Sequence, residues 1–200
     1  PNKYASQLEG SKSFMKDLCN TYSIPTAAYS TFDNYEEAVK YLKEQSLPIV
    51  VKANGLAAGK GVTVADSFEM AEKALKEIFE NKFGTNMTAV IEEFMEGEEA
   101  SYFVCTDGTE FISLESAQDH KRIGENDTGP NTGGMGAYSP TPLVTKKMHD
   151  EVMEKVITPT LNELKNRGIE YKGFLYAGLM INGNEIKVLE YNCRFGDPET

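Results

Sequence analysis

Several common functional signatures are absent from the sequence. It has no basic cluster, and its 20 lysine and arginine residues against 31 aspartate and glutamate residues give a formal net charge of −11. This balance argues against nucleic acid or an anionic membrane surface as a partner. No apolar run approaches the roughly 20 residues that a membrane-spanning helix needs, and no signal peptide is recognised. We therefore expect a globular protein with neither membrane nor nucleic-acid partners.

Cysteine and histidine are also scarce. The three cysteines, Cys19, Cys105 and Cys193, are far apart and include no C-x-x-C pair, which predicts reduced, buried thiols in a cytoplasmic protein. The histidines do not indicate a metal site, because His120 has no partner at ligand spacing and His149 is expected on a helix surface. The sequence contains no internal repeat and no signal for an oligomeric state.

The first half of the chain has the patterns of an α+β lobe. Forty per cent of the 200 residues are hydrophobic, enough for one large core or two small ones. Apolar spacing predicts a helix over 11–22, and capping boxes that begin at Asp33 and Asp66 predict two more. Residues 25–94 then form a compact lobe. Its strands are predicted near 26–30, 48–52, 62–65 and 88–94.

The second half has the patterns of two hairpins and a long helix. The hairpins are predicted over 99–117, with a turn at Asp107-Gly108, and over 174–191. Between them, 145–167 is predicted to be helical, with a kink at Pro159 and an end at Gly168.

The segment 48–65, PIVVKANGLAAGKGVTVA, is the most informative. An apolar strand ends in Lys52, and the loop that follows contains Gly55, Gly59, Lys60 and Gly61. Glycines let backbone N–H groups approach an anion, and the lysines add positive charge, which suits a nucleotide triphosphate. The loop is not a Walker A loop, because Lys60 is followed by glycine and a strand. A plain hairpin with a flexible connection is the alternative.

A second glycine-rich segment, DHKRIGENDTGPNTGGMGAYSPT over 119–141, has no periodicity and is longer than most loops without a function. Its glycines would allow close approach to a ligand, and His120, Lys121, Arg122 and Asp127 offer polar contacts. An ordered surface loop without a ligand is the alternative.

The end of the sequence, VLEYNCRFGDPET, suggests catalytic geometry. Because side chains alternate along a strand, Glu190, Asn192 and Arg194 are expected on one face. The two oxygen donors suit Mg²⁺, and the guanidinium suits an anion. The alternative is a solvent-facing polar stripe with Val188 packed inward.

The segment EEFMEGEE over 92–99 follows an apolar strand. Backbone groups of residues 93–95 could bind an adenine edge, and Glu99 could accept hydrogen bonds from ribose hydroxyls. Taken alone, these residues are more typical of a charged loop after a strand.

Together these regions resemble the ATP-grasp superfamily and, within it, the phosphoribosylamine–glycine ligase family. The resemblance extends over all 200 residues and is carried by KANGLAAGKGV, by the 119–140 segment and above all by RFGDPET. It implies an α+β ATP-grasp fold in which two lobes clasp ATP. Residues 1–24 would be a helical segment of the larger lobe, 25–94 the small lobe and 95–200 the rest of the larger lobe. The sequence starts at Pro1 and stops within a pattern, which indicates an excised piece, and the resemblance implies flanking N- and C-terminal domains outside it.

The resemblance also implies roles for individual residues. Phosphate binding is implied for Lys12, Lys52, Gly55, Gly59, Lys60 and Gly61. Adenine and ribose binding is implied for Glu92, Glu93, Phe94, Met95 and Glu99. The Mg²⁺ or Mn²⁺ ligands would be Glu190 and Asn192. Substrate contacts are implied for Asp119, Arg122, Asp127, Gly133, Gly134 and Arg194, with Arg194 and Lys60 also catalytic.

The implied reaction joins glycine to 5-phosphoribosylamine through glycyl phosphate, with ATP converted to ADP and phosphate. Two positions depart from the family pattern: Asn54 replaces the more usual aspartate, and Gly178 stands where many superfamily members have a metal-binding acid. The second departure implies fewer protein ligands for the metal. Two other functions stay open: another ATP-grasp carboxylate–amine ligase, and a nucleotide-binding module without catalysis.

Overall fold

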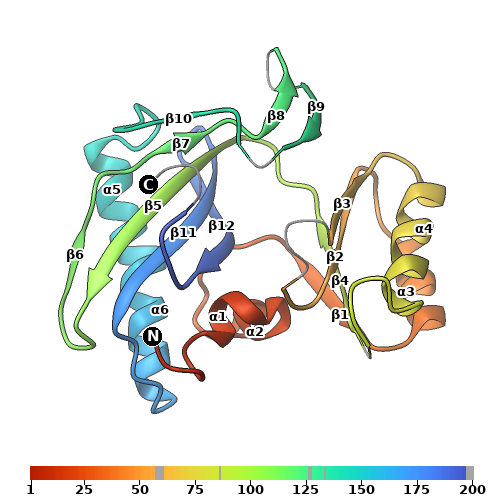
Figure 1. Cartoon of the computed structure of the whole chain (residues 1–200), viewed down its shortest axis with the longest axis horizontal. Helices are drawn as coiled ribbons and strands as arrows, with labels where there is room; N and C mark the ends of the chain where they lie inside the picture. Colours follow the sequence, from red (N-terminus) through yellow and green to blue (C-terminus); the bar gives the residue numbers. More distant parts are fainter. Residues whose placement is uncertain (57–60, 86, 126–127, 133, 197–200) are drawn as a thin grey trace. The chain divides into compact units, whose positions relative to one another are not determined.

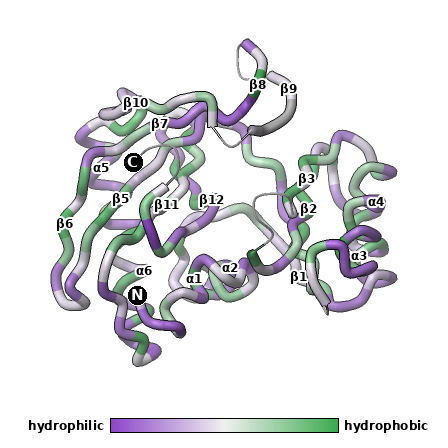
Figure 2. Tube along the Cα trace, viewed as in Figure 1, coloured by the Kyte–Doolittle hydropathy of each residue, from purple (hydrophilic) through white to green (hydrophobic). Residues whose placement is uncertain are grey.

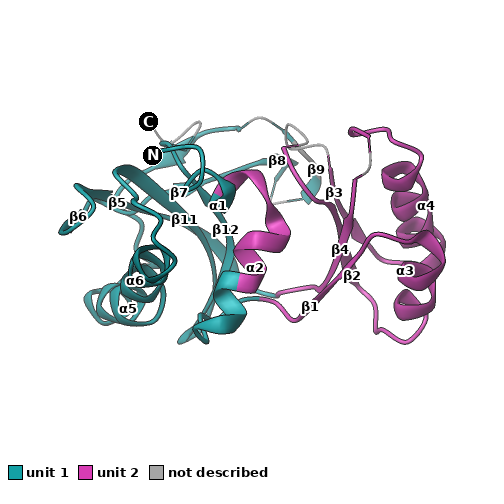
Figure 3. Ribbon diagram, turned by 90° about the horizontal axis from the view of Figure 1, so that it is seen from below, with its two compact units in different colours: residues 1–8, 18–26, 96–200 teal, residues 9–17, 27–95 magenta. Residues whose placement is uncertain are grey.

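The computed structural model describes residues 1–56, 61–85, 87–125, 128–132 and 134–196 (Figure 1). The chain divides into two compact units (Figure 3). Unit 1 comprises residues 1–8, 18–26 and 96–200, and unit 2 comprises residues 9–17 and 27–95. Residues 9–17, which the resemblance assigned to the larger lobe, thus group with the smaller unit.

Unit 2 is built on a four-stranded antiparallel sheet with the order β1-β4-β2-β3. Its strands are β1 (Tyr29–Phe32), β2 (Ile49–Ala53), β3 (Val62–Ala65) and β4 (Ala89–Glu93). The predicted strands over 48–52, 62–65 and 88–94 are confirmed to within a residue. The strand predicted near 26–30 begins only at Tyr29, because Thr26 instead forms a parallel bridge with Val188 in unit 1.

Two helices, α3 (Tyr35–Leu42) and α4 (Phe68–Phe79), cover one face of this sheet (Figure 1). Figure 2 shows hydrophilic residues recurring along both helices, as expected where only one side of a helix is buried. The core between helices and sheet includes Leu42, Val51, Leu75, Ile78 and Ile91.

The caps of these helices correct the sequence prediction by one residue. Asn34 accepts a hydrogen bond from the amide of Glu37, and Ser67 accepts one from Met70. The predicted caps were Asp33 and Asp66. In each case the aspartate precedes an equally good capping residue. The local sequence alone therefore does not settle which side chain accepts the hydrogen bond from the first turn of the helix.

Unit 1 is built on a second four-stranded antiparallel sheet with the order β12-β11-β5-β6. Its strands are β5 (Glu98–Thr106), β6 (Phe111–Ser113), β11 (Gly173–Asn182) and β12 (Glu185–Asn192). Both predicted hairpins are confirmed. The strand predicted to run to residue 117 ends at Ser113, and Ala117 beyond it forms an isolated bridge with Ser101.

The long helix of unit 1 is interrupted before Pro159. It consists of α5 (Lys146–Val152), a π-helical segment (Met153–Ile157) and α6 (Thr158–Asn166). Proline has no amide hydrogen for the helical ladder, and the wider π turn lies next to it. Gly168, with φ 71°, follows the helix end as predicted.

The helices lie on the sheet face that carries Tyr102 and Tyr191. The Tyr191 hydroxyl is 2.6 Å from the Thr160 hydroxyl, and the Tyr102 hydroxyl is 2.7 Å from Nδ1 of His149. Burial raises the pKa of Tyr102 to about 12. His149 is half-buried and contacts Tyr102, which corrects the prediction of a plain surface residue.

The segment over 119–141 is more regular than its sequence predicted. β7 (Gln118–Asp119) pairs with β10 (Ala137–Tyr138), and β8 (Arg122–Gly124) pairs with β9 (Thr128–Asn131). Strands of two to four residues are too short to give a readable alternation, so sequence periodicity did not reveal them. Within the described residues, no helix is long and apolar enough to span a membrane.

α1 (Gln7–Gly10) and α2 (Lys12–Thr21) precede both sheets in the sequence. The predicted helix over 11–22 is confirmed as α2, whose residues divide between unit 2 and unit 1 after Asp17.

Candidate functional site

The sheet face of unit 2 that does not carry the α3 and α4 core has a charged cluster at its centre. Lys52 on β2 pairs with Val90, while Glu92 on β4 pairs with Val50, so the two charged side chains are diagonal neighbours on one face. The Glu92 carboxylate forms ion pairs with Lys52 and with Lys16 of α2. The exposed fractions are 1% for Lys16, 2% for Glu92 and 12% for Lys52.

Lys16 is the innermost member of this cluster, and the sequence analysis missed it. Its ammonium donates to the carbonyl of Ala27 at 3.4 Å and lies 5.5 Å from the ring centroid of Tyr29. Tyr29 is directly opposite Glu92 in the β1–β4 pair. A signal was present in the sequence, because Lys16 follows the predicted phosphate-binding Lys12 by one helical turn.

The start of the glycine loop is tied to the first turn of α2. Lys12 donates from Nζ to the carbonyl of Gly55 at 2.8 Å. Asn54 accepts a hydrogen bond from the amide of Ser13 and donates from Nδ2 to the hydroxyls of Ser13 and Thr88, both at 2.9 Å. Gly55 has φ 115°, a conformation that favours glycine. The loop therefore leaves β2 from a fixed point.

The predicted loop residues Gly59 and Lys60 lie outside the described residues. Gly61 is described, and its carbonyl accepts a hydrogen bond from the amide of Ala53 at 2.7 Å. Val62 and Val64 follow it on the same face as Lys52 and Val50, with 44% and 37% of their surface exposed. This exposed apolar strip beside a lysine was not noticed in the sequence.

The predicted adenine-binding residues follow at the end of β4. Glu93 is exposed, and its carboxylate accepts a hydrogen bond from the amide of Ala28 at 3.2 Å. Phe94 is half-buried and Met95 is buried. Glu92 was placed in the same predicted set, but its carboxylate forms ion pairs with Lys16 and Lys52.

In unit 1, a β-bulge determines which side chains of β12 share a face. Gly178 pairs with Glu190 and Leu179 with Val188, so Leu189 is an extra residue in β12. Val188 and Tyr191 are therefore both buried against the helices, and Glu190 and Asn192 lie on the opposite face. Without the bulge, simple alternation would put Glu190 on the same face as Val188.

Arg194 is not part of this strand face. β12 ends at Asn192, and the exposed Arg194 donates from Nη1 to the carbonyl of Phe195 at 2.9 Å. The expectation of three aligned side chains is thus correct for two and wrong for the third, because alternation applies only within a strand.

Phe195 anchors the segment that follows β12. Its ring centroid is 4.0 Å from that of Phe174 and 6.1 Å from that of Phe103. These contacts fix the backbone next to Arg194.

The side chains of Tyr176 and Glu190 lie close to Gly178, which has no side chain of its own. A Cβ at this position would lie 3.2 Å from the Tyr176 hydroxyl and 3.3 Å from Cγ of Glu190. The Tyr176 hydroxyl accepts a hydrogen bond from Ser101 at 3.3 Å. A side chain at position 178 would therefore require Tyr176 or Glu190 to shift by a few tenths of an ångström.

Lys121 is surrounded by acidic groups on unit 1. Its ammonium lies 3.5 Å from Asp119 and 3.7 Å from Glu99. Burial lowers the pKa of Lys121, but Tyr176, Glu99, Asp119 and Glu190 outweigh this effect and raise it. The structure thus brings the predicted ribose contact Glu99 and the predicted substrate contact Asp119 to one lysine.

Two of the other predicted substrate residues, Arg122 and Gly134, are described. Arg122 is exposed on β8, and the amide of Gly134 donates to the hydroxyl of Thr132 at 3.1 Å. Asp127 and Gly133 lie outside the described residues.

Glu190 and Asn192 fit a hard divalent cation in chemistry, since both present oxygen donors on one face. Among the described residues, no group of three or more histidine, cysteine or acidic side chains is placed to hold a metal ion. A cation here would therefore need oxygen atoms from a bound ligand or water.

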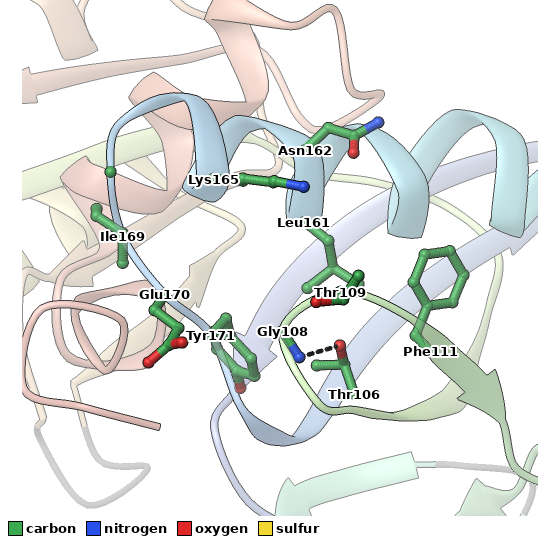
Figure 4. Close-up of a pocket in the computed structure, with 11 residues that line it drawn as sticks. Thr106, Gly108, Thr109, Phe111, Leu161, Asn162, Lys165, Ile169, Glu170 and Tyr171 are labelled. Carbon is green, nitrogen blue, oxygen red and sulfur yellow. Dashed lines mark hydrogen bonds between the residues drawn. The ribbon is translucent and has the colours of Figure 1, made fainter.

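A cavity of about 310 Å³ lies elsewhere in unit 1 (Figure 4). Figure 4 shows side chains from α6, including Lys165, and from the turn at Gly108, whose amide donates to the hydroxyl of Thr106. None of the described residues that line it is a predicted site residue.

The fold is that of the ATP-grasp class. A carboxyaminoimidazole ribonucleotide synthase from Aspergillus clavatus, complexed with ATP, has the same fold at 16% identity. Its TM-score is 0.73 over 96% of this chain and 46% of that chain. Phosphoribosylamine–glycine ligase from Thermotoga maritima is more similar, with 39% identity and a TM-score of 0.89. That match covers 99% of this chain and 51% of the other.

The chain belongs to the family described as phosphoribosylglycinamide synthetase, ATP-grasp (A) domain, which matches residues 10–200. The phosphoribosylamine–glycine ligases of Vibrio vulnificus and Pasteurella multocida are 56% and 57% identical to it over 203 aligned residues. All of this chain is covered, but only 47% of each relative. The chain thus spans about half the length of these curated relatives.

Proposed function

We propose that this chain is the ATP-binding part of a cytoplasmic phosphoribosylamine–glycine ligase. The whole enzyme joins glycine to 5-phosphoribosylamine and converts ATP to ADP and phosphate. The observation that carries the proposal is the Lys16–Glu92–Lys52 cluster, together with Lys12 at the base of the glycine loop. Family membership supports the same function.

Unit 2 supplies the positive charge for the triphosphate. Lys52 is the least buried member of its cluster, and the Lys12 ammonium already contacts a carbonyl oxygen, as it would a phosphate oxygen. The exposed Val62 and Val64 beside Lys52 offer an apolar surface for the adenine ring. Residues 93–95 would supply polar groups for its edge.

Unit 1 supplies the oxygen donors. Glu190 and Asn192 would hold Mg²⁺ or Mn²⁺, which when bound neutralises phosphate charge. Lys121 balances the carboxylates of Glu99 and Asp119 beside them. Arg194, on a backbone fixed by Phe195, would contact the glycine carboxylate or the transferring phosphoryl group.

The proposed chemistry needs no protein nucleophile. The glycine carboxylate attacks the γ-phosphorus of ATP and ADP leaves; the amine of phosphoribosylamine then displaces phosphate from glycyl phosphate. The residues of this chain position the reactants and stabilise negative charge. Another ATP-grasp carboxylate–amine ligase is the second candidate. A module without catalysis is disfavoured because Lys52, Glu190 and Asn192 are all present.

Two measurements on the full-length protein test the proposal. Calorimetry should detect ATP binding that depends on Mg²⁺, and its absence in folded protein would refute the nucleotide site. Release of ADP should then require both glycine and phosphoribosylamine. Equal release with another acid in place of glycine would favour the second candidate.

A further inference from the structure

The cluster on unit 2 contains two buried lysines for one buried carboxylate. A single lysine would be enough to balance Glu92 in a purely structural ion pair. Instead, the Glu92 carboxylate contacts both Lys16 and Lys52, so the group carries a net charge of +1 in a region with little water. The second positive charge therefore calls for an explanation beyond stability.

The two lysines are not equivalent. Lys16 is 1% exposed, and besides Glu92 its ammonium contacts the Ala27 carbonyl and the face of the Tyr29 ring. Lys52 is 12% exposed and comes from the strand that leads into the glycine loop. Lys16 is thus the inner counter-ion, and Lys52 is the lysine at the surface of the cluster.

We propose that Lys16 is a positioning residue for nucleotide binding: it neutralises Glu92, so that Glu92 fixes the direction of Lys52 without cancelling its charge. The inference rests on the proposed ATP-binding function. If Lys16 were absent, Glu92 and Lys52 would form a neutral pair, and the attraction of Lys52 for a phosphate group would fall. With Lys16 present, Lys52 is both held in place and left cationic.

The test compares ATP with adenosine, which lacks phosphates, as ligands of the full-length protein. Dissociation constants are measured for wild type, Lys16→Met, Lys16→Arg and the double variant Lys16→Met/Glu92→Gln. Lys82→Met is the matched control, because it breaks an exposed lysine–glutamate pair of the same unit, to Glu77.

We expect Lys16→Met to weaken ATP binding about tenfold and to leave adenosine binding unchanged, since only the phosphates sense the lost charge. Lys16→Arg should bind ATP nearly as wild type does, because it keeps the charge. The double variant should recover most of the lost affinity, because removing both inner charges leaves Lys52 cationic again. The control should bind both ligands as wild type does.

Other results would overturn the inference. Parallel losses for ATP and adenosine would mean that Lys16 has only a structural role, and wild-type ATP affinity in Lys16→Met would mean that it has none. If Lys16→Met fails to fold, the double variant decides alone: ATP affinity within about fivefold of wild type supports the inference, and a larger loss refutes it. Adenosine binding by wild type without any ATP binding would refute the proposed function itself.

Discussion

The sheet face opposite α3 and α4 in unit 2 and the sheet face opposite α5 and α6 in unit 1 carry opposite charge patterns. On unit 2, two lysines surround one buried glutamate. On unit 1, Lys121 lies among acidic groups that include Glu99 and Asp119. Each face has one central group of the opposite sign, which offsets the repulsion between the like charges around it. A chain of net charge −11 can thus present one locally basic face and one locally acidic face.

The acidic face should show the largest effect when it is changed. In the full-length enzyme, Glu190→Gln and Asn192→Ala are each expected to reduce kcat about 100-fold, because their contacts strengthen as charge develops on the phosphoryl group. ATP affinity, measured by calorimetry, should change much less. Wild-type kcat for both variants at saturating Mg²⁺ would contradict the assignment.

Changes on the basic face, where Lys16 and Lys52 contact Glu92, are expected to lower the affinity for ATP rather than kcat. Lys52→Met is expected to weaken ATP binding about 30-fold, the scale of one charge-assisted hydrogen bond to phosphate. Calorimetry on full-length protein measures this, with Lys76→Met, an exposed lysine of α4, as the control. Equal dissociation constants for Lys52→Met and the control would contradict the proposal that the basic face binds the phosphates of ATP.

Removing the central lysine of the acidic face tests whether it is a counter-ion. Lys121→Met removes the ammonium that lies 3.5 Å from the buried Asp119, and we expect the free energy of unfolding to fall by about 1 kcal/mol. Added Mg²⁺ should restore part of this loss in Lys121→Met and give less stabilisation to wild type. Urea unfolding measures both effects, and Lys147→Met, at an exposed pair with Glu151, is the control. A Lys121→Met variant as stable as the control would contradict the counter-ion role.

The smallest effect is expected at Asn54. Its Nδ2 donates to the hydroxyls of Ser13 and Thr88, and those hydroxyls could rotate to donate to an aspartate instead. Asn54→Asp should therefore change ATP affinity by less than about threefold, from one added negative charge near Lys12. Thermal unfolding should give nearly the wild-type midpoint; a large decrease would show that the amide donors are essential.

Much of the fold could be predicted because its signals are local. The apolar strand before Lys52, the turn at Asp107-Gly108 and the helix end at Gly168 each depend on a few neighbouring residues. The strand over 89–93 and the pairing of Glu190 with Asn192 on one face were predicted in the same way. The assignments of ligand-binding roles stay predictions.

The features that could not be predicted depend on residues far apart in the sequence. Asn34 and Ser67, rather than the aspartates before them, cap their helices. Their extended backbone places each side chain where it accepts a hydrogen bond from an amide of the first helical turn. Lys16 is buried because Glu92, 76 positions later, provides its counter-ion. Buried charge requires a partner, and sequence spacing does not reveal one at this distance.

By itself the sequence determined which residue types are available at each place: glycines in the loop after β2, lysines beside them, and oxygen donors at alternate positions of a late strand. Only the tertiary structure decided which faces these residues share. The bulge at Leu189 separates Glu190 from Val188, and the β2–β4 register brings Glu92 to Lys52. Alternation gives the period of a strand, but register and bulges come from its partners, and they set the face that each side chain occupies.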